Sequence, residues 1–443
     1  MPLKRRTRPA ILLLGILLCA LACAAPAAAA GGLAALQADL RGQLALAGPH
    51  DGAYVYDVSA RKALFSERAT AMRPPASVEK LYTATAALAT MGPAARLTTS
   101  VYGVGRLLAG GVWEGNLYLR GGGDPTFGSS AFIASHYGGE GASVLSLVTQ
   151  LVKTQGIHHV TGSVEGDETF FDARRGEPSS NYAPDPFLEG TLSGVAFNRG
   201  TSGSIHGGRA PAAYAARALW GALKGDGVSI RGASGTAGTP AGAVLLAKVE
   251  SPTVAQLLGL MLPPSDNFFA ETLVKDMGAL FGGAGTTAAG AAVVAGSIAS
   301  TFGFTPRIVD GSGLSRADRT SPYEVVDLLA GLAGTPTGQI LREHLAVAGH
   351  SGTLERRMRH TGADGRCQGK TGTLTGASNL VGYCQAAGGH LLAFAIFNDG
   401  ISTGAAHVFQ DHMTISIADS RIATAELARA RPGGGRIATG TFR

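Results

Sequence analysis

The chain has 443 residues, enough for about two or three domains and a sizeable hydrophobic core. Charged residues make up only 15% of it, and the net charge of +6 includes Lys4, Arg5, Arg6 and Arg8 at the N-terminus. No run of Lys and Arg with interleaved aromatic residues occurs, which argues against nucleic-acid binding. Because the sequence shows neither metal-ligand spacing nor an H-E-x-x-H segment, we predict no metal and no other cofactor.

The first residues have the three parts of a secretory signal peptide. A basic stretch over residues 4–8 precedes an apolar run over residues 10–22, and small residues follow over 24–30. The apolar run is shorter than the roughly 20 residues that span a membrane. We therefore predict a signal peptide over residues 1–30 and secretion across the cytoplasmic membrane, into the periplasm or another extracytoplasmic cell-wall space. The alternatives are an uncleaved anchor and a lipid attached to Cys23.

The mature chain is expected to begin with a helix and a hairpin. Residues 32–47 carry apolar side chains at helical spacing. Residues 53–58 and 63–66 are predicted strands, with Ser59-Ala60-Arg61 as the turn between them. This turn starts an S-x-x-K pattern that ends at Lys62. Because its serine would sit on a hairpin tip, we interpret this first pattern as accidental.

A second S-x-x-K pattern, Ser77-Val78-Glu79-Lys80, follows two prolines and opens a stretch with helical spacing. Ser77 should lie near a helix N-terminus, with Lys80 one turn away on the same face. A serine hydroxyl needs an adjacent base to act as a nucleophile, and a neutral Lys80 could be that base. Its pKa would have to be lowered by burial or by a nearby cation, for which Lys370 is a candidate. The alternative is a plain helix-capping serine.

Residues 97–246 differ in character, because short alternating runs are separated by Gly-rich turns. We predict an inserted, mostly β region here, between residues 31–96 and 247–425, which form one discontinuous domain. In that domain the spacing predicts helices over residues 254–262, 268–280, 323–333 and 405–417, and strands over residues 369–374, 380–383 and 391–397. Residues 426–443, rich in Gly and Arg, are predicted to be a disordered tail.

Two further segments combine polar residues in a way that suits a binding site. Ser265-Asp266-Asn267 follows two prolines and precedes a predicted helix, so an ordinary capping segment is the alternative. Lys370-Thr371-Gly372-Thr373 lies on a predicted strand, where a glycine often marks the close approach of a ligand to the backbone. A lysine and two threonine hydroxyls there could hold a carboxylate. The alternative is an exposed edge strand with solvated side chains.

With the signal peptide removed, two cysteines remain, Cys367 and Cys384, on either side of the Lys370 motif. Their midpoint falls at Thr375-Gly376, a pair typical of turns. A hairpin that turns there places the two cysteines opposite each other, and an oxidising compartment allows such a pair to form a disulfide. Two buried free thiols are the alternative.

The order S-x-x-K, S-D-N and K-T-G is typical of penicillin-binding proteins and class A β-lactamases. Longer segments narrow the match, because they resemble the D-alanyl-D-alanine carboxypeptidase/endopeptidase family, the low-molecular-mass class C penicillin-binding proteins. The resemblance covers nearly the whole mature chain. Its segments are residues 75–81, the Gly-rich Asp-Pro element at 119–125, and residues 265–271, 310–316, 352–354 and 370–374.

The resemblance implies an α+β fold with a serine β-lactamase/penicillin-binding transpeptidase-like core, an antiparallel sheet flanked by helices. It also implies extra domains between the first two motifs. Because the gap between Ser77 and Ser265 is shorter than in the best-known members, one of these domains is expected to be reduced or missing. The implied activity is that of a D-Ala-D-Ala carboxypeptidase or DD-endopeptidase. Peptidoglycan peptides would be its substrates and β-lactam antibiotics its covalent inhibitors.

The resemblance assigns catalytic roles to five residues. The nucleophile is Ser77, and Lys80 acts as its base. A proton reaches the departing D-alanine nitrogen through Ser265 and Lys370, while Asn267 orients both Lys80 and the substrate amide.

Five further residues are implied in substrate binding. Thr371, Gly372 and Thr373 form the strand that binds the terminal carboxylate, and the N–H group of Thr373 joins that of the nucleophile in an oxyanion hole. Asp124 and Arg316, from the family-specific segments, are candidates for contacting the side chain of the stem peptide. Their alternative is a structural Asp-Pro turn and a solvated arginine.

Two other functions remain open on the sequence. A β-lactamase-like hydrolase would use the same serine, but no E-x-x-L-N segment, the context of a deacylating glutamate, occurs between Ser77 and Ser265. A non-catalytic secreted peptidoglycan-binding protein would be expected to have degraded motifs, whereas all three are intact. The sequence predicts neither the oligomeric state, nor the third residue of the stem peptide, nor a preference between carboxypeptidase and endopeptidase cleavage.

Overall fold

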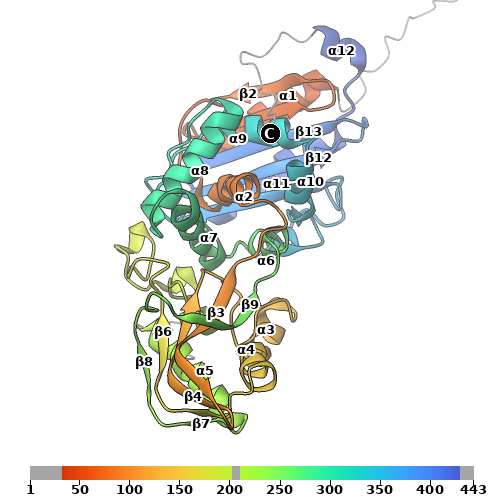
Figure 1. Cartoon of the computed structure of the whole chain (residues 1–443). Coiled ribbons are helices and arrows are strands. Elements are labelled where there is room, and N and C mark those ends of the chain that lie inside the picture. The colour runs from red at the N-terminus through yellow and green to blue at the C-terminus, as the bar shows by residue number, and fades with distance from the viewer. Residues whose placement is uncertain (1–31, 202–209, 430–443) are drawn as a thin grey trace, which may run out of the picture.

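The computed structural model describes residues 32–201 and 210–429. The predicted signal peptide, its Cys23 alternative and residues 430–443 of the predicted tail lie outside the described residues. Figure 1 shows two bodies: a sheet between layers of helices at the top, and a second sheet with its own helices at the bottom. Within the described ranges, no helix has both the length and the apolar character needed to cross a membrane.

The upper body is built on a six-stranded antiparallel sheet with the strand order β10-β11-β12-β13-β1-β2. Strands from both ends of the chain therefore lie side by side, and the insertion separates them only in sequence. The six strands are β1 (Gly52–Asp57), β2 (Lys62–Glu67), β10 (Ala346–Val347), β11 (Cys367–Leu374), β12 (Ala377–Gln385) and β13 (Leu391–Asp399).

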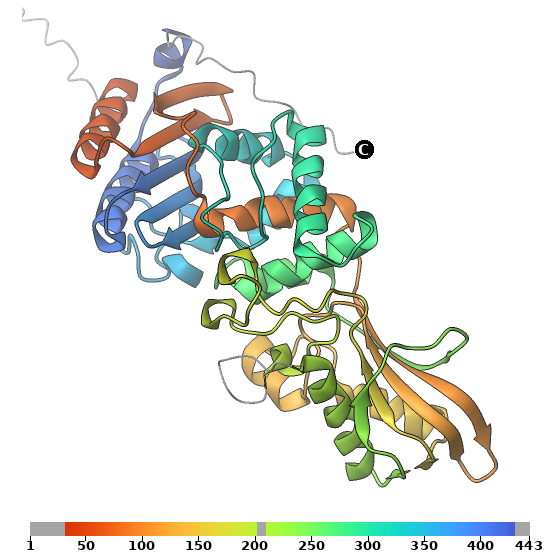
Figure 2. The same cartoon turned by 90° about the vertical axis from the view of Figure 1, so that its left-hand side faces the viewer.

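Both faces of this sheet are buried, each under its own helices (Figure 2). Along β13, Phe394 and Ile396 face one core, whereas Ala395 and Phe397 face the other, because successive side chains of a strand point in opposite directions. The first core lies under α1 (Leu33–Ala47) and α11 (Thr403–Asp419). The second is covered by α2 (Lys80–Thr90), α6 (Val254–Met261), α7 (Asn267–Phe281), α8 (Thr287–Phe302), α9 (Pro322–Leu332) and α10 (Pro336–Glu343).

The lower body is the insertion. Its long hairpin of β3 and β4 is flanked by β9. On the other side, β5 and β6 pair with β4 in parallel, β7 pairs with β5, and β8 pairs with β6. The strands are β3 (Thr98–Leu108), β4 (Val112–Gly121), β5 (His159–Val160), β6 (Val164–Asp167), β7 (Ser229–Ile230), β8 (Ser234–Thr236) and β9 (Val244–Glu250). Its helices are α3 (Ser130–Tyr137), α4 (Val144–Thr149), its π-helical continuation η2 (Gln150–Thr154), and α5 (Pro211–Gly225). These elements enclose a core of their own.

Three elements differ from the sequence prediction. The insertion was expected to be mostly β, but three α-helices pack against its sheet, and β9 extends beyond the predicted boundary at residue 246. Helix α8 was not predicted, because its many Ala and Gly residues leave no clear apolar stripe. Residues 424–429 form α12 (Thr424–Arg429), so the prediction of a disordered tail from residue 426 is wrong for its first residues.

Candidate active site

Ser77 lies in a 3₁₀ turn, η1 (Ala76–Glu79), and α2 begins after it at Lys80. The tight turn thus takes the place of the first helical turn that the sequence predicted. Ala76, directly before the serine, has a φ of +49°. Such a left-handed conformation costs a residue with a side chain on the order of 1–3 kcal/mol, and it persists only where surrounding structure enforces it.

Two glycines from distant segments provide that enforcement. A Cβ on Gly313 would lie 1.9 Å from the carbonyl oxygen of Ala76, and one on Gly372 would lie 2.4 Å from that of Pro75. Only residues without a side chain allow so close an approach of two backbones. The sequence interpretation of Gly372 as a site of ligand approach needs correction, because the backbone that approaches it is the nucleophile turn itself.

Lys80 is fully buried and makes three hydrogen bonds. Its Nζ donates to Ser77 Oγ at 2.9 Å, to Asn267 Oδ1 at 2.6 Å and to the carbonyl oxygen of Ser312 at 2.8 Å. Burial lowers the pKa of Lys80 to about 8, and the carboxyl groups of Asp310 and Glu271 partly oppose this shift. The cause is therefore desolvation, the first of the two possibilities considered from the sequence.

The second and third motifs meet through Lys370. Its Nζ donates to Ser265 Oγ and to the carbonyl oxygen of Thr371, both at 2.8 Å. Burial, together with the charge of Lys80, lowers the pKa of Lys370 well below its usual value. Ser265 itself has a φ of +69° and directly precedes the residue that caps α7. The five predicted catalytic residues thus form two hydrogen-bonded groups, Ser77 with Lys80 and Asn267, and Ser265 with Lys370. The charge effect of Lys80 on Lys370 connects the two groups.

Asn267 links this group to the insertion. Its Oδ1 accepts from Lys80, while its Nδ2 donates at 2.7 Å to the carbonyl oxygen of Phe187. Phe187 belongs to a 3₁₀ turn, η4 (Pro186–Leu188), and its side chain is 72% exposed. The amide of Asn267 is therefore held between Lys80 and a turn of the insertion.

The predicted carboxylate-binding residues lie at the end of β11. Thr373 is exposed, whereas Thr371 is buried and its Oγ1 donates at 2.8 Å to Thr353 Oγ1. Arg316 is exposed, and its guanidinium donates to the carbonyl oxygen of Thr375, in the turn that follows β11. Arg316 thus lies at the rim of the site, on the side of Thr373.

Asp124 does not share this position. Its side chain is 2% exposed, and its Oδ1 accepts from the N–H and the hydroxyl of Thr126. Burial raises its pKa to about 7. The expectation that Asp124 contacts a stem peptide is therefore corrected in favour of the structural Asp-Pro turn, since its carboxyl group faces the interior.

Sequence reasoning missed a buried group of carboxyl side chains around Lys80. Glu79, Glu271, Asp310 and Asp318 are all 0% exposed. Burial, with the neighbouring Asp310, raises the pKa of Glu271 to about 8 and that of Glu79 well above its usual value. Four carboxyl groups this close cannot all be ionised away from water, so they share protons.

Two of these carboxyl groups shape the loop that holds the lysine. Glu271 Oε1 accepts from the N–H groups of Gly311 and Ser312 at 2.9 and 2.8 Å. The carboxyl group of Asp310 accepts from the N–H groups of Gly313 and Ser315 in the same loop. One signal in the sequence was available: Glu271 lies four residues after Asn267, on the same face of a predicted helix.

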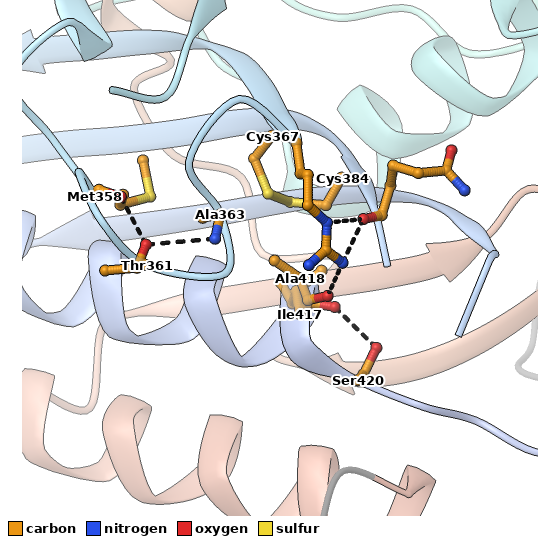
Figure 3. Close-up of a disulfide and its surroundings, with 10 residues drawn as sticks. Met358, Thr361, Ala363, Cys367, Cys384, Ile417, Ala418 and Ser420 are labelled. Carbon is orange, nitrogen blue, oxygen red and sulfur yellow. Dashed lines mark hydrogen bonds between the residues drawn. A yellow bond between two sulfur atoms is a disulfide. The ribbon is translucent and has the colours of Figure 1, made fainter. Parts of the chain in front are cut away.

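The two cysteines occupy paired positions on β11 and β12, directly opposite each other, and form a disulfide. Figure 3 shows this bond at the ends of the strands beside Ala418 and Ser420, where α11 ends. Both cysteines are buried in the core under α1 and α11. The bridge therefore fastens the strand that carries Lys370 at the end away from the serines.

Three comparisons place the chain among known proteins. The family described as D-Ala-D-Ala carboxypeptidase 3 (S13) matches residues 33–185 and 189–419. The D-alanyl-D-alanine carboxypeptidase of Actinomadura sp. (strain R39) is 30% identical over 457 residues, which cover 85% of this chain and 82% of that protein.

Among solved structures, penicillin binding protein 4 of Haemophilus influenzae matches with a TM-score of 0.70 at 20% identity, over 85% of this chain and 97% of that one. A structure of the same Haemophilus protein complexed with a β-lactam matches with a TM-score of 0.65 at 22% identity, over the same shares of the two chains. This likeness confirms the predicted penicillin-binding fold. With the family match spanning most of the chain, the resemblance found in the sequence is also confirmed, and the protein belongs to the D-Ala-D-Ala carboxypeptidase 3 (S13) family.

Proposed function

We propose that this carboxypeptidase works through an acyl-enzyme on Ser77, with Lys80 as its base. The observation that carries the proposal is the contact of 2.9 Å between Lys80 Nζ and Ser77 Oγ, made by a lysine that is 0% exposed. Burial lowers the pKa of Lys80 to about 8. A substantial fraction of the neutral amine is therefore present near neutral pH, as a general base requires.

The reaction begins as Ser77 Oγ attacks the carbonyl carbon of the penultimate D-alanine and passes its proton to Lys80. The N–H groups of Ser77 and Thr373 stabilise the resulting oxyanion. Lys80 passes this proton on, Ser265 and Lys370 relay it to the nitrogen of the terminal D-alanine, the C–N bond breaks, and free D-alanine leaves. A water molecule then attacks the ester on Ser77, which releases the shortened peptide as an acid and restores the serine.

We assign substrate recognition to residues around the reacting atoms. The carboxylate of the terminal D-alanine binds at Thr371 and Thr373, next to Lys370. Asn267 orients the substrate amide, for which its Nδ2 must exchange the carbonyl oxygen of Phe187 for one of the substrate. Arg316, at the rim, contacts the side chain of the stem peptide.

The protein acts on wall peptides and therefore outside the cytoplasm. We infer that residues 1–30 direct it to the periplasm or an equivalent cell-wall space. We also infer that β-lactam antibiotics acylate Ser77 and remain bound as inhibitors. The complex of the Haemophilus relative with a β-lactam supports this inference.

The test combines a covalent label with a product assay. A fluorescent penicillin should label the purified protein and stay bound for long times, and the protein should release D-alanine from a pentapeptide ending in D-Ala-D-Ala. Parallel assays on cross-linked wall fragments measure endopeptidase cleavage by the same site.

Each alternative has its own outcome. Rapid turnover of the penicillin without release of D-alanine would assign a β-lactamase instead. No label and no D-alanine from a folded protein would leave only peptidoglycan binding and would overturn the proposal.

A further inference from the structure

One arginine of the insertion reaches the middle residue of the second motif. Arg199 lies in a 3₁₀ turn, η5 (Phe197–Gly200), where both Asn198 and Arg199 have left-handed backbones with φ of 49° and 59°. Its guanidinium forms an ion pair with Asp266 Oδ2. Asp266 is the central residue of Ser265-Asp266-Asn267, and its other oxygen caps α7 by accepting from the N–H of Phe269.

The arginine is enclosed rather than solvated. Its side chain is 12% exposed, and its Nε donates to the hydroxyl of Tyr137 at 2.9 Å. The guanidinium carbon also lies within 5.7 Å of the ring centroids of Tyr137, Phe268 and Phe269. Desolvated charge pairs and cation–π contacts are much stronger than solvated ones, so this guanidinium has one well-defined position.

The same guanidinium holds a second partner. Its Nη1 lies 3.5 Å from Glu189 Oε2 and donates at 3.4 Å to the carbonyl oxygen of Glu189. Glu189 directly follows η4, whose Phe187 accepts from Asn267. The family match is interrupted at residues 186–188, the three residues of η4. Arg199 therefore connects Asp266 with the turn that contacts Asn267, the two residues that follow Ser265.

Taking Ser77 acylation as the reaction, we propose that Arg199 is a positioning residue for it: through Asp266 and Glu189 it fixes Ser265 and Asn267 relative to Lys80. The insertion then takes part in acyl transfer as well as in covering the site. Strained backbones are typical of positions where function requires a particular geometry, and Asn198 and Arg199 provide two in succession.

A charge effect accompanies this positioning. The charged and titratable groups that face Lys80 are Glu79 on η1, Asp266 before α7, Glu271 on α7, Asp310 in the loop after α8, and Lys370 on β11. Asp266 is among those that raise the pKa of Lys80. An arginine paired with Asp266 neutralises part of this effect, so removing either partner changes the pH at which Lys80 becomes a base, in opposite directions.

The test compares R199Q, R199K and D266N with the R199K/D266N double variant. R175Q is the matched control, because Arg175 forms a similar, mostly buried ion pair with Glu168 in the insertion without touching the second motif. For each protein the second-order rate constant of acylation by a penicillin is measured against pH, and thermal unfolding is followed in parallel.

We expect R199Q to acylate about 100-fold more slowly than wild type, the effect of a misplacement of about 1 Å. R199K should lose less of the acylation rate, because an ammonium keeps the positive charge. It should still be slower than wild type, because it cannot span Asp266 and Glu189 as a planar guanidinium does. The acid limb of the pH profile should move to higher pH in R199Q and to lower pH in D266N. In the double variant the effects of R199K and D266N should not multiply.

Several results would overturn the inference. R175Q slowing acylation as much as R199Q would mean that Arg199 only stabilises the insertion. The same follows if the effects of R199K and D266N on the acylation rate are independent, or if neither R199Q nor D266N moves the acid limb of the pH profile. R199K and D266N decide the question even if R199Q does not fold. A wild-type protein that penicillin does not acylate at all would instead refute the proposed function, which separates the two failures.

Discussion

The chain contains the S-x-x-K pattern twice, and the two copies differ in their surroundings. Ser59 is exposed on the turn between β1 and β2, where its Oγ accepts a hydrogen bond of 3.0 Å from the N–H of Leu391. Lys62 is already part of β2 and donates to the carbonyl oxygen of Leu427. Both side chains of this first copy therefore serve the packing of a hairpin.

The second copy is enclosed. Lys80 is fully buried and donates to Ser77, and glycines from two distant segments fix the backbone of the serine. Burial lowers the pKa of this lysine, as the proposed role of a base requires. The comparison teaches that the groups around an S-x-x-K pattern decide whether its serine and lysine meet in a buried, hydrogen-bonded pair.

The largest effect is expected from the serines themselves. Ser77→Ala should abolish labelling by a fluorescent penicillin, because the hydroxyl that Lys80 contacts among the described residues is that of Ser77. Ser59→Ala should label at the wild-type rate, and so should Lys62→Ala. Gel fluorescence after a short incubation measures all three, and circular dichroism confirms that each variant is folded. Labelling that survives Ser77→Ala would remove the distinction between the two copies.

The next effect concerns the loop that holds Lys80. Glu271→Ala removes the acceptor of two buried N–H groups, and each such loss costs about 1–3 kcal/mol. The Ser312 carbonyl oxygen should then move away from Lys80, and acylation should slow by up to about 100-fold. Glu271→Gln, which keeps an oxygen acceptor, should retain most of the rate. Equal losses in both variants would show that charge matters here and loop geometry does not.

A smaller effect is expected from pH. Because Lys80 must be neutral to accept a proton and its pKa lies at about 8, acylation should rise by about tenfold per pH unit below that value and level off above it. Stopped-flow acylation between about pH 6 and pH 9 measures this limb. Lys62→Ala should leave the limb in place. A rate that stays flat across this range would mean that Lys80 is not the titrating base.

The sequence was sufficient to predict that the motif residues lie close together and that the two cysteines pair. Ser77 could be separated from Ser59 because two prolines and helical spacing surround it, and both signals are local. The turn at Thr375-Gly376 correctly set Cys367 against Cys384, since register follows from the turn in a hairpin.

The sequence could not supply what depends on packing between distant segments. Asp124 and Arg316 looked equivalent as family-specific polar residues, yet Asp124 faces the interior and Arg316 the rim of the site. Arg199 carries no local signal of its contact with Asp266, and the spacing of Glu271 from Asn267 does not reveal its contact with the loop at Ser312, because these partners lie in other elements. Only the folded chain shows that these side chains meet the second motif and the loop at Ser312.

The smallest effect on catalysis is expected from the disulfide, which supports the second copy of the pattern from a distance. The disulfide between Cys367 and Cys384 fastens β11 to β12, whereas the hairpin of Ser59 has no such bridge among the described residues. Replacing both cysteines by serine should lower the free energy of unfolding by about 3 kcal/mol, the value for a loop of this length. Acylation of the folded protein should stay near the wild-type rate, because the hydrogen bonds of Lys370 to Ser265 and Thr371 lie at other positions of the strand.

Urea unfolding with and without reductant measures the difference, and intact-mass analysis after alkylation verifies the bridge in the wild-type protein. A double variant as stable as the wild type, or a wild type with two free thiols, would show that hydrogen bonding alone keeps β11 in register beside the nucleophile.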